Sequence, residues 1–128
     1  MSKGLKTLLL LHAIITFAAA IVLIAAPDWI PSAVDIALVP SQYLLSYFLA
    51  AAELAMAYLS YSARNFKEAP AIKSVILTLL LFHASTGILE LYAFISGASA
   101  KIIGNILVRM IVVCLLYYFG VANYRKSA

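Results

Sequence analysis

Four long apolar segments alternate with short polar stretches along this chain. The segments cover residues 5–26, 43–62, 75–96 and 102–124, and no proline lies inside them. Each is close to the roughly 20 residues that a helix needs to cross about 30 Å of hydrocarbon. A spanning segment must also satisfy its own backbone hydrogen bonds, which helices do. The pattern predicts an all-α fold, an integral membrane four-helix bundle that forms one domain over residues 1–128.

The interval between the first and second segments is not an ordinary polar loop. Residues 27–42 place apolar side chains between prolines, and Pro31 and Pro40 stand where a short helix could begin and end. A short helix with an apolar face lies at a membrane surface. We therefore expect a short amphipathic segment in the outer interface, where it covers one end of the bundle.

The composition argues against a soluble protein. Hydrophobic residues make up 66% of the chain and charged residues only 11%, whereas a soluble domain is about half apolar and about a quarter charged. The net charge of +4 could suggest nucleic acid as a partner. The basic residues, however, stand at the ends of the apolar segments and form no stripe. We therefore predict the lipid bilayer as the partner, and no nucleic acid.

The distribution of lysine and arginine predicts the orientation in the membrane. With four spans, one side of the membrane receives Lys3, Lys6, Arg64, Lys67, Lys73, Arg125 and Lys126. The other side has only Lys101, and the loop over residues 27–42 has no basic residue. Because short basic loops stay in the cytoplasm, we expect both termini on the cytoplasmic side.

Five ionisable residues stand inside the apolar segments, although a charge near the bilayer centre costs roughly 2.5–3.5 kcal/mol. They are His12, Glu53, His83, Glu90 and Arg109. With a rise of about 1.5 Å per residue, the first three fall near the middle of the membrane. Glu90 and Arg109 share a depth in the outer third, on helices joined by a tight hairpin. We expect a structural ion pair between them, with Asn105 one turn from Arg109.

Two helix faces connect these layers. His83, Thr86 and Glu90 recur at i, i+3 and i+7, so they form one stripe on the third helix. On the second helix, Glu53 lies in a stripe of small residues, which leave room for a ligand or a close neighbouring helix: Ser46, Ala50, Ala57 and Ser60. We predict a polar pocket at the midplane whose ligand-binding residues are His12, Glu53, His83, Thr86, Glu90 and Arg109.

Several kinds of chemistry suit such a pocket. Glu53 and His83 are candidate catalytic groups, since a carboxylate beside imidazoles can hold or pass a proton. Two histidines and a carboxylate could bind a metal ion, and His12 with His83 could ligate a b-type haem. The ExxH spacing of di-iron bundles is absent, and no metal ligands are assigned. A purely structural polar network would also explain these residues, so the sequence leaves the cofactor and any reaction open.

The third segment also carries a resemblance. Residues 83–97 read HASTGILELYAFISG, a polar and apolar run that ends in glycine before a short hairpin. Together with the four-helix plan, this run resembles the small bacterial DoxX-like membrane proteins of unknown function. The resemblance covers most of the chain in layout. It implies a four-helix protein of the bacterial inner (cytoplasmic) membrane, and it transfers no catalytic residue.

Three hypotheses for the function follow. In the first, the protein binds or transforms a lipophilic small molecule in the midplane pocket. In the second, it is an accessory or structural subunit of a larger membrane complex, and its polar residues only hold the helices together. In the third, it is a small proton-coupled transporter with Glu53 as the coupling carboxylate. Because four helices are few for a solute pathway, the third hypothesis requires a homo-oligomer.

Overall fold

The computed structural model describes residues 1–122, and these residues form helices and short connections without any strand. The helices are α1 (Lys3–Ala25), α2 (Trp29–Ala33), η1 (Pro40–Gln42, a 3₁₀ turn), α3 (Tyr43–Ala63), α4 (Ala69–Ile95), α5 (Ile102–Tyr117) and η2 (Tyr118–Ala122, a π-helix). Four of them are long and apolar enough to cross a membrane: α1, α3 with η1, α4, and α5 with η2. The all-α class and the four long helices are confirmed. The expected end of the last helix at Tyr124, and the basic residues Arg125 and Lys126, lie outside the described residues.

The helix ends follow local signals in the sequence. Ser2 caps α1, because its Oγ accepts a hydrogen bond from the Leu5 amide at 3.2 Å. The α4 helix begins at Ala69, so the expected start at residue 75 was wrong. Pro70 stands in the first turn of α4, where a missing amide proton costs no helical hydrogen bond. The polar stretch before residue 75 is therefore the first part of a long helix.

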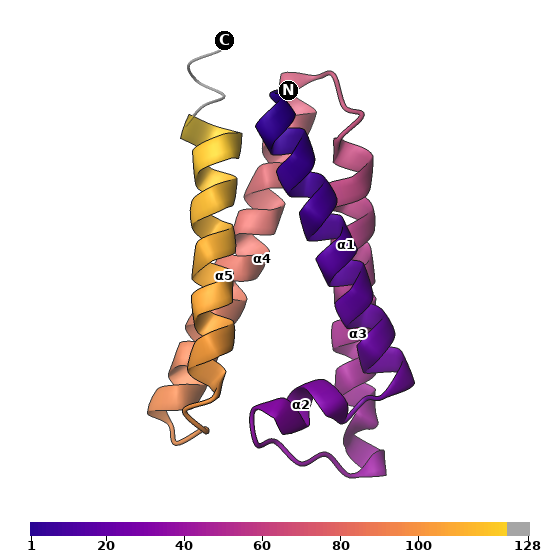
Figure 1. The fold of residues 1–128 in the computed structure, drawn as a ribbon, viewed down its shortest axis with the longest axis vertical. Helices are drawn as coiled ribbons and strands as arrows, with labels where there is room; N and C mark the ends of the chain where they lie inside the picture. Colours follow the sequence, from indigo (N-terminus) through magenta and orange to yellow (C-terminus); the bar gives the residue numbers. More distant parts are fainter. Residues whose placement is uncertain (123–128) are drawn as a thin grey trace.

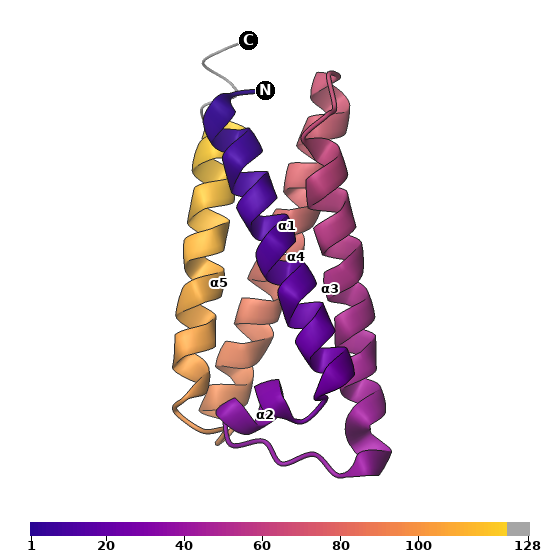
Figure 2. The same cartoon turned by 45° about the vertical axis from the view of Figure 1, so that its right-hand side comes forward.

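The four long helices form two antiparallel pairs, α1 with α3 and α4 with α5 (Figure 1). The pairs lean together at the end that holds the N-terminus and separate toward the opposite end. We call these the closed end and the open end. The α2 helix and the connection to η1 lie at the open end, near the turn between α4 and α5 (Figure 2). The short helix expected between the first two segments is therefore present.

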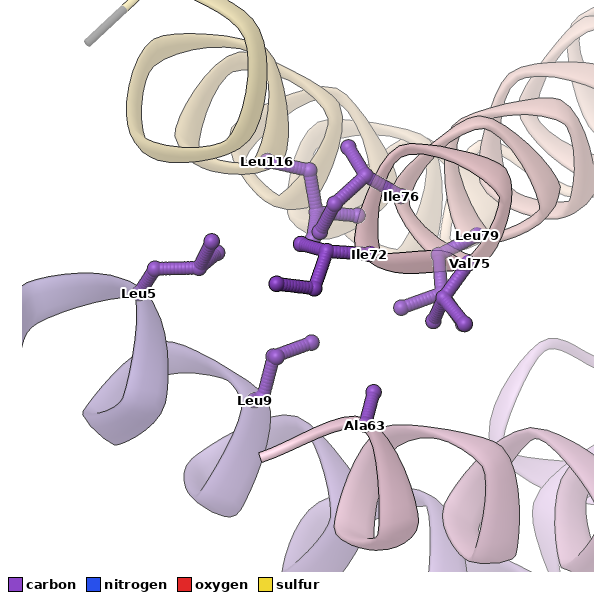
Figure 3. Close-up of a cluster of buried hydrophobic side chains, with 8 residues drawn as sticks. All are labelled: Leu5, Leu9, Ala63, Ile72, Val75, Ile76, Leu79 and Leu116. Carbon is purple, nitrogen blue, oxygen red and sulfur yellow. The ribbon is translucent and has the colours of Figure 1, made fainter. Parts of the chain in front are cut away.

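Apolar side chains from all four long helices fill the closed end (Figure 3). The cluster consists of Leu5, Leu9, Ala63, Ile72, Val75, Ile76, Leu79 and Leu116. A second buried cluster, toward the open end, contains only Ala20, Leu23 and Ala50, which belong to α1 and α3. The two pairs are thus held against each other by apolar packing at the closed end, whereas packing near the open end holds α1 to α3.

A glycine lets the end of the chain approach α4 at the closed end. A Cβ added to Gly120 would lie 2.7 Å from Ile76 Cγ2, and two further Ile76 side-chain atoms lie within 3.1 Å of it. Ile76 is itself buried in the apolar cluster, so it has little freedom to move. Any side chain at position 120 therefore pushes the η2 helix away from α4.

We expect Gly120→Ala to destabilise the protein by about 1–3 kcal/mol, because it overpacks the closed end. The measurement is the unfolding free energy of the purified protein in detergent. Gly104→Ala is the matched control, since nothing lies within 4 Å of a Cβ at Gly104, and alanine favours a helix over glycine. Equal stabilities of the two variants would contradict the packing of η2 against α4.

Candidate functional site

The ionisable residues of the apolar segments lie on the inward faces of the helices. His12 on α1, Glu53 on α3 and His83 on α4 are each less than 8% exposed. The side chains of Glu90 and Arg109 are 18% and 12% exposed. This placement agrees with the cost of facing a charged group toward lipid.

The two histidines meet at the centre of the molecule. The His12 and His83 Nε2 atoms lie 2.6 Å apart, and the two rings are perpendicular. On its other side, His12 Nδ1 lies 2.8 Å from Ser60 Oγ on α3. Ser60 is fully buried. The sequence pattern brought His12 and His83 to one depth, but it identified Ser60 only as a small residue and not as a partner of His12.

The neighbouring arginine favours one assignment of the protons on the ring nitrogens. Arg109 NH1 approaches His83 Nδ1 at 3.5 Å, a long hydrogen bond in which the guanidinium can only donate. His83 Nδ1 therefore accepts, and the His83 proton sits on Nε2. His83 then donates to His12 Nε2, and His12 donates from Nδ1 to Ser60. Both imidazoles are neutral in this arrangement, and the hydrogen bonds run in one direction from Arg109 to Ser60.

Arg109 also forms the ion pair that the sequence predicted. Its Nε donates to Glu90 Oε1 at 2.9 Å, and Asn105 Nδ2 donates to the same oxygen at 2.6 Å. Arg109 also passes close to Gly87 on α4; a Cβ there would be 3.7 Å from Arg109 Cβ, an ordinary van der Waals contact. The hydrogen bonds from Asn105 through Glu90, Arg109, His83 and His12 to Ser60 form one polar chain that touches all four long helices.

The buried carboxylate of Glu53 does not join this polar chain. Within residues 1–122, Glu53 makes no hydrogen bond or ion pair, although it is only 7% exposed. The expected layer of His12, Glu53 and His83 is thus divided, since the two imidazoles contact each other and not the carboxylate. Glu53 lies two turns, about 10 Å, toward the open end from Ser60. Glu90 lies the same distance from His83, so the two carboxylates occupy one level on opposite helix pairs.

The hydroxyl of Thr86 is bonded within its own helix. Its hydroxyl donates to the Phe82 carbonyl oxygen at 2.7 Å and approaches the His83 carbonyl oxygen at 3.2 Å, both within α4. Such bonds to the preceding turn are common for threonine in apolar helices. Although Thr86 lies between His83 and Glu90 on the helix, its polar atom is engaged by its own backbone.

A cavity of about 540 Å³ opens between the two helix pairs at the open end. Its walls come from α1, the connection after α1, α3, α4 and α5: Leu23, Ile30, Pro31, Ala33, Val34, Ile36, Leu38, Leu45, Ser46, Leu49, Glu90, Ile102, Gly104, Asn105 and Val108. We call it the open-end cavity. Glu90 and Asn105 are its polar members beside Ser46. The predicted midplane residues His12, Glu53 and His83 do not line it.

One carboxylate oxygen at this cavity lacks a partner. Glu90 Oε1 accepts two hydrogen bonds, but Glu90 Oε2 is buried and has none. A buried polar atom without a hydrogen bond costs about 1–3 kcal/mol. Such an atom marks a place where a donor is missing. The apolar residues of the stretch 30–38 were the sequence signal for this site, although they were interpreted only as a covering segment.

The geometry of the histidines disfavours a metal ion between them. Nitrogens that share a tetrahedral metal at about 2.0–2.1 Å must lie more than about 3 Å apart, and the two Nε2 atoms lie 2.6 Å apart. Metal binding would also displace the Nε2 proton of His83 onto Nδ1, which faces the donor Arg109. Within residues 1–122, no group of three or more His, Cys, Asp or Glu side chains is arranged to hold a metal ion.

An ion pair joins the two helix pairs across the mouth of the cavity. Lys101 Nζ donates to Asp35 Oδ1 at 2.7 Å, and Ser99 Oγ donates to Asp35 Oδ2 at 2.6 Å. Asp35 follows α2, whereas Ser99 and Lys101 belong to the turn between α4 and α5. The hydrogen bond from Lys101 lowers the pKa of the Asp35 carboxyl below its ordinary value of 3.8, and Ser99 acts in the same direction.

Comparisons with known proteins find no match. No protein-family model, no curated protein and no solved structure matches the chain. The DoxX-like resemblance therefore stays a prediction, and the argument for a function rests on the chemistry of the site.

We expect His12→Ala and His83→Ala each to destabilise the protein by about 1–3 kcal/mol, because each leaves a buried donor or acceptor without its partner. Because the two rings share one hydrogen bond, the double variant should cost less than the sum of the single variants, by about 0.5–3 kcal/mol. Unfolding of all three variants in detergent measures this difference. Ser85→Ala is the control, since Ser85 is exposed and donates only to the carbonyl of Phe82. Additive effects of the two histidine variants would contradict the contact.

The ion pair at the mouth should respond to pH through Asp35. The pKa of Asp35 is lowered in the fold. The stability that the Asp35–Lys101 ion pair contributes is therefore fully present above the unfolded-state pKa and is lost as the pH falls below 3.8. We expect Asp35→Asn to lose protection against amide hydrogen exchange over residues 34–39 at pH 7, and the natural protein to lose the same protection, relative to the intrinsic exchange rate, only in acid. Asp28→Asn is the control, because the Asp28 side chain makes no capping hydrogen bond. Equal exchange in both variants would contradict the ion pair.

Proposed function

We propose that this protein is an integral membrane protein that binds a lipophilic small molecule in the open-end cavity. The observation that carries the proposal is an unpartnered carboxylate oxygen, Glu90 Oε2, at the wall of a cavity that is otherwise mostly apolar. A cavity of about 540 Å³ with few polar groups is typical of small-molecule sites. The apolar walls suit a hydrocarbon body, and the free oxygen suits a donor on the head of the ligand.

The membrane part of the proposal is supported by the outer surface of the bundle. Large apolar side chains are exposed on every long helix, among them Ile15, Phe48, Leu81 and Ile111. Exposed apolar surface of this extent is disfavoured in water and favoured in lipid. The four long helices are each able to cross a bilayer by length and composition.

The charge at the two ends supports one orientation. The closed end carries Lys3, Lys6, Arg64, Lys67 and Lys73, whereas Lys101 is the basic residue of the open end and is paired with Asp35. We therefore propose that the closed end and both termini are cytoplasmic, and that the cavity opens toward the other side. The bacterial inner membrane and the DoxX-like relationship belong to the same proposal.

The geometry favours binding over chemistry. Glu53 and His83, the candidate acid and base, do not line the cavity. His83 is held between Arg109 and His12, so its ring nitrogens are both engaged. The polar chain instead positions Arg109, which in turn holds Glu90 Oε1 and directs the carboxylate. We propose that the histidines serve the ligand site through this contact.

We expect a bound lipophilic molecule to be lost when the cavity is filled. Gly104→Phe places a ring in open space at the cavity wall, whereas Leu107→Phe, the matched control, changes an exposed residue on the same helix. Native mass spectrometry of gently solubilised protein should detect the bound mass in the natural chain and in Leu107→Phe but not in Gly104→Phe. A natural chain without any bound molecule, or equal occupancy in both variants, would contradict the proposal.

A further inference from the structure

We infer that the open-end cavity takes a lipophilic monocation, an amphiphile with an ammonium head that donates to Glu90. This inference rests on the proposed function of the cavity and specifies the chemical class of the ligand. It follows from three properties of the described residues. These are the different numbers of hydrogen bonds that the two Glu90 oxygens accept, the excess of carboxylates over positive charges in the interior, and the acidic charge of the open end.

The first property is the hydrogen bonding of Glu90. Both existing donors, from Asn105 and Arg109, share Oε1, and Oε2 has no donor. Glu90 lines the cavity, although its Oε2 atom is itself covered. The last torsion of a glutamate side chain is soft, so a small rotation of the carboxylate can present Oε2 to a donor inside the cavity. An ammonium group offers such a donor, and a carboxylate or phosphate head offers none.

The second property is the charge balance of the interior. Arg109 is the single positive charge there, while Glu53 and Glu90 are two carboxylates at one level of the bundle. The histidines add no charge, because the hydrogen bond from Arg109 fixes His83 in its neutral form. The ion pair of Arg109 with Glu90 leaves the charge of Glu53 without a partner. An isolated buried charge is costly. Glu53 does not line the cavity, but its carboxylate disfavours a further negative charge at this level of the bundle and favours a positive one.

The third property is the field at the open end. Asp28 and Asp35 belong to the connection at the open end, and Lys101, which is paired with Asp35, is the one basic residue of the described chain at that end. Together with Glu90 at the cavity wall, these acidic residues outnumber Lys101 and Arg109. A surplus of one sign of charge around a cleft attracts the opposite sign. A cation therefore binds in this cavity favourably, whereas an anion is repelled by the acidic residues of the open end and by Glu90.

The inference can be tested with dodecylamine and dodecanol, which share one hydrocarbon chain and differ in the head. At pH 7 the amine is protonated, since alkyl ammonium groups such as that of lysine have a pKa near about 10.4. The protein is placed in nanodiscs of phosphatidylcholine. The fluorescence of Trp29, the single tryptophan, reports on the site because Ile30 and Pro31 beside it line the cavity.

We expect dodecylamine to change Trp29 fluorescence saturably and to bind at least about tenfold more tightly than dodecanol. Glu90→Gln should remove most of this preference, because it removes both the charge and the free acceptor. Glu68→Gln is the matched control, as Glu68 precedes α4 at the closed end. Should Glu90→Gln fail to fold, dodecyltrimethylammonium is compared with dodecylamine on the natural chain, because it keeps the positive charge but has no N–H to donate to Glu90; it should bind more weakly.

The outcomes separate the ligand class from the cavity itself. Equal binding of the amine and the alcohol, unaffected by Glu90→Gln, or equal binding of dodecylamine and dodecyltrimethylammonium, would overturn the inference and leave the lipophilic site intact. No saturable binding of either compound would contradict both the inference and the proposed function. Nanodiscs that contain phosphatidylethanolamine distinguish the source of the head: competition with dodecylamine indicates a membrane aminolipid, and its absence indicates a free amine.

Discussion

The contact between the His12 and His83 rings is the one hydrogen bond that joins the two helix pairs in the interior of the described chain. In the interior, where water is excluded, a polar group that faces a neighbouring helix is destabilising unless it forms a hydrogen bond there. Ser60 on one side and Arg109 on the other complete the hydrogen bonding of the two rings. The position of Arg109, and through it that of Glu90, depends on this contact.

Much of the fold could be predicted because apolar segments of spanning length admit few alternatives. The Glu90–Arg109 pair was also predictable, since a tight hairpin fixes which residues of two consecutive helices face each other at one depth. The depth of His12 and His83 followed from counting along helices that run in opposite directions. These predictions use one dimension only, the position along the membrane normal, which a hydrophobic pattern specifies well.

The hydrophobic pattern could not show which side chains at one depth of the bundle contact each other. Glu53 shares its helix face with Ser60, yet Ser60 and not Glu53 meets His12, because the crossing of α1 and α3 decides which turn of one helix reaches the other. The separation of the pairs at the open end is likewise a property of packing between segments distant in sequence. The early start of α4 at Ala69 depended on Pro70, whose place in a first turn is compatible with helix but does not require it.

The apolar cluster at the closed end limits access to the interior from that side. Among the described residues, Leu5, Ile72 and Leu116 pack together at the end that holds the N-terminus, and such close packing excludes water there. The open-end cavity is therefore separated from the closed end by this packed cluster. Access to the cavity from the closed end would require the two helix pairs to tilt about their centre, so that the closed end opens and the open end closes.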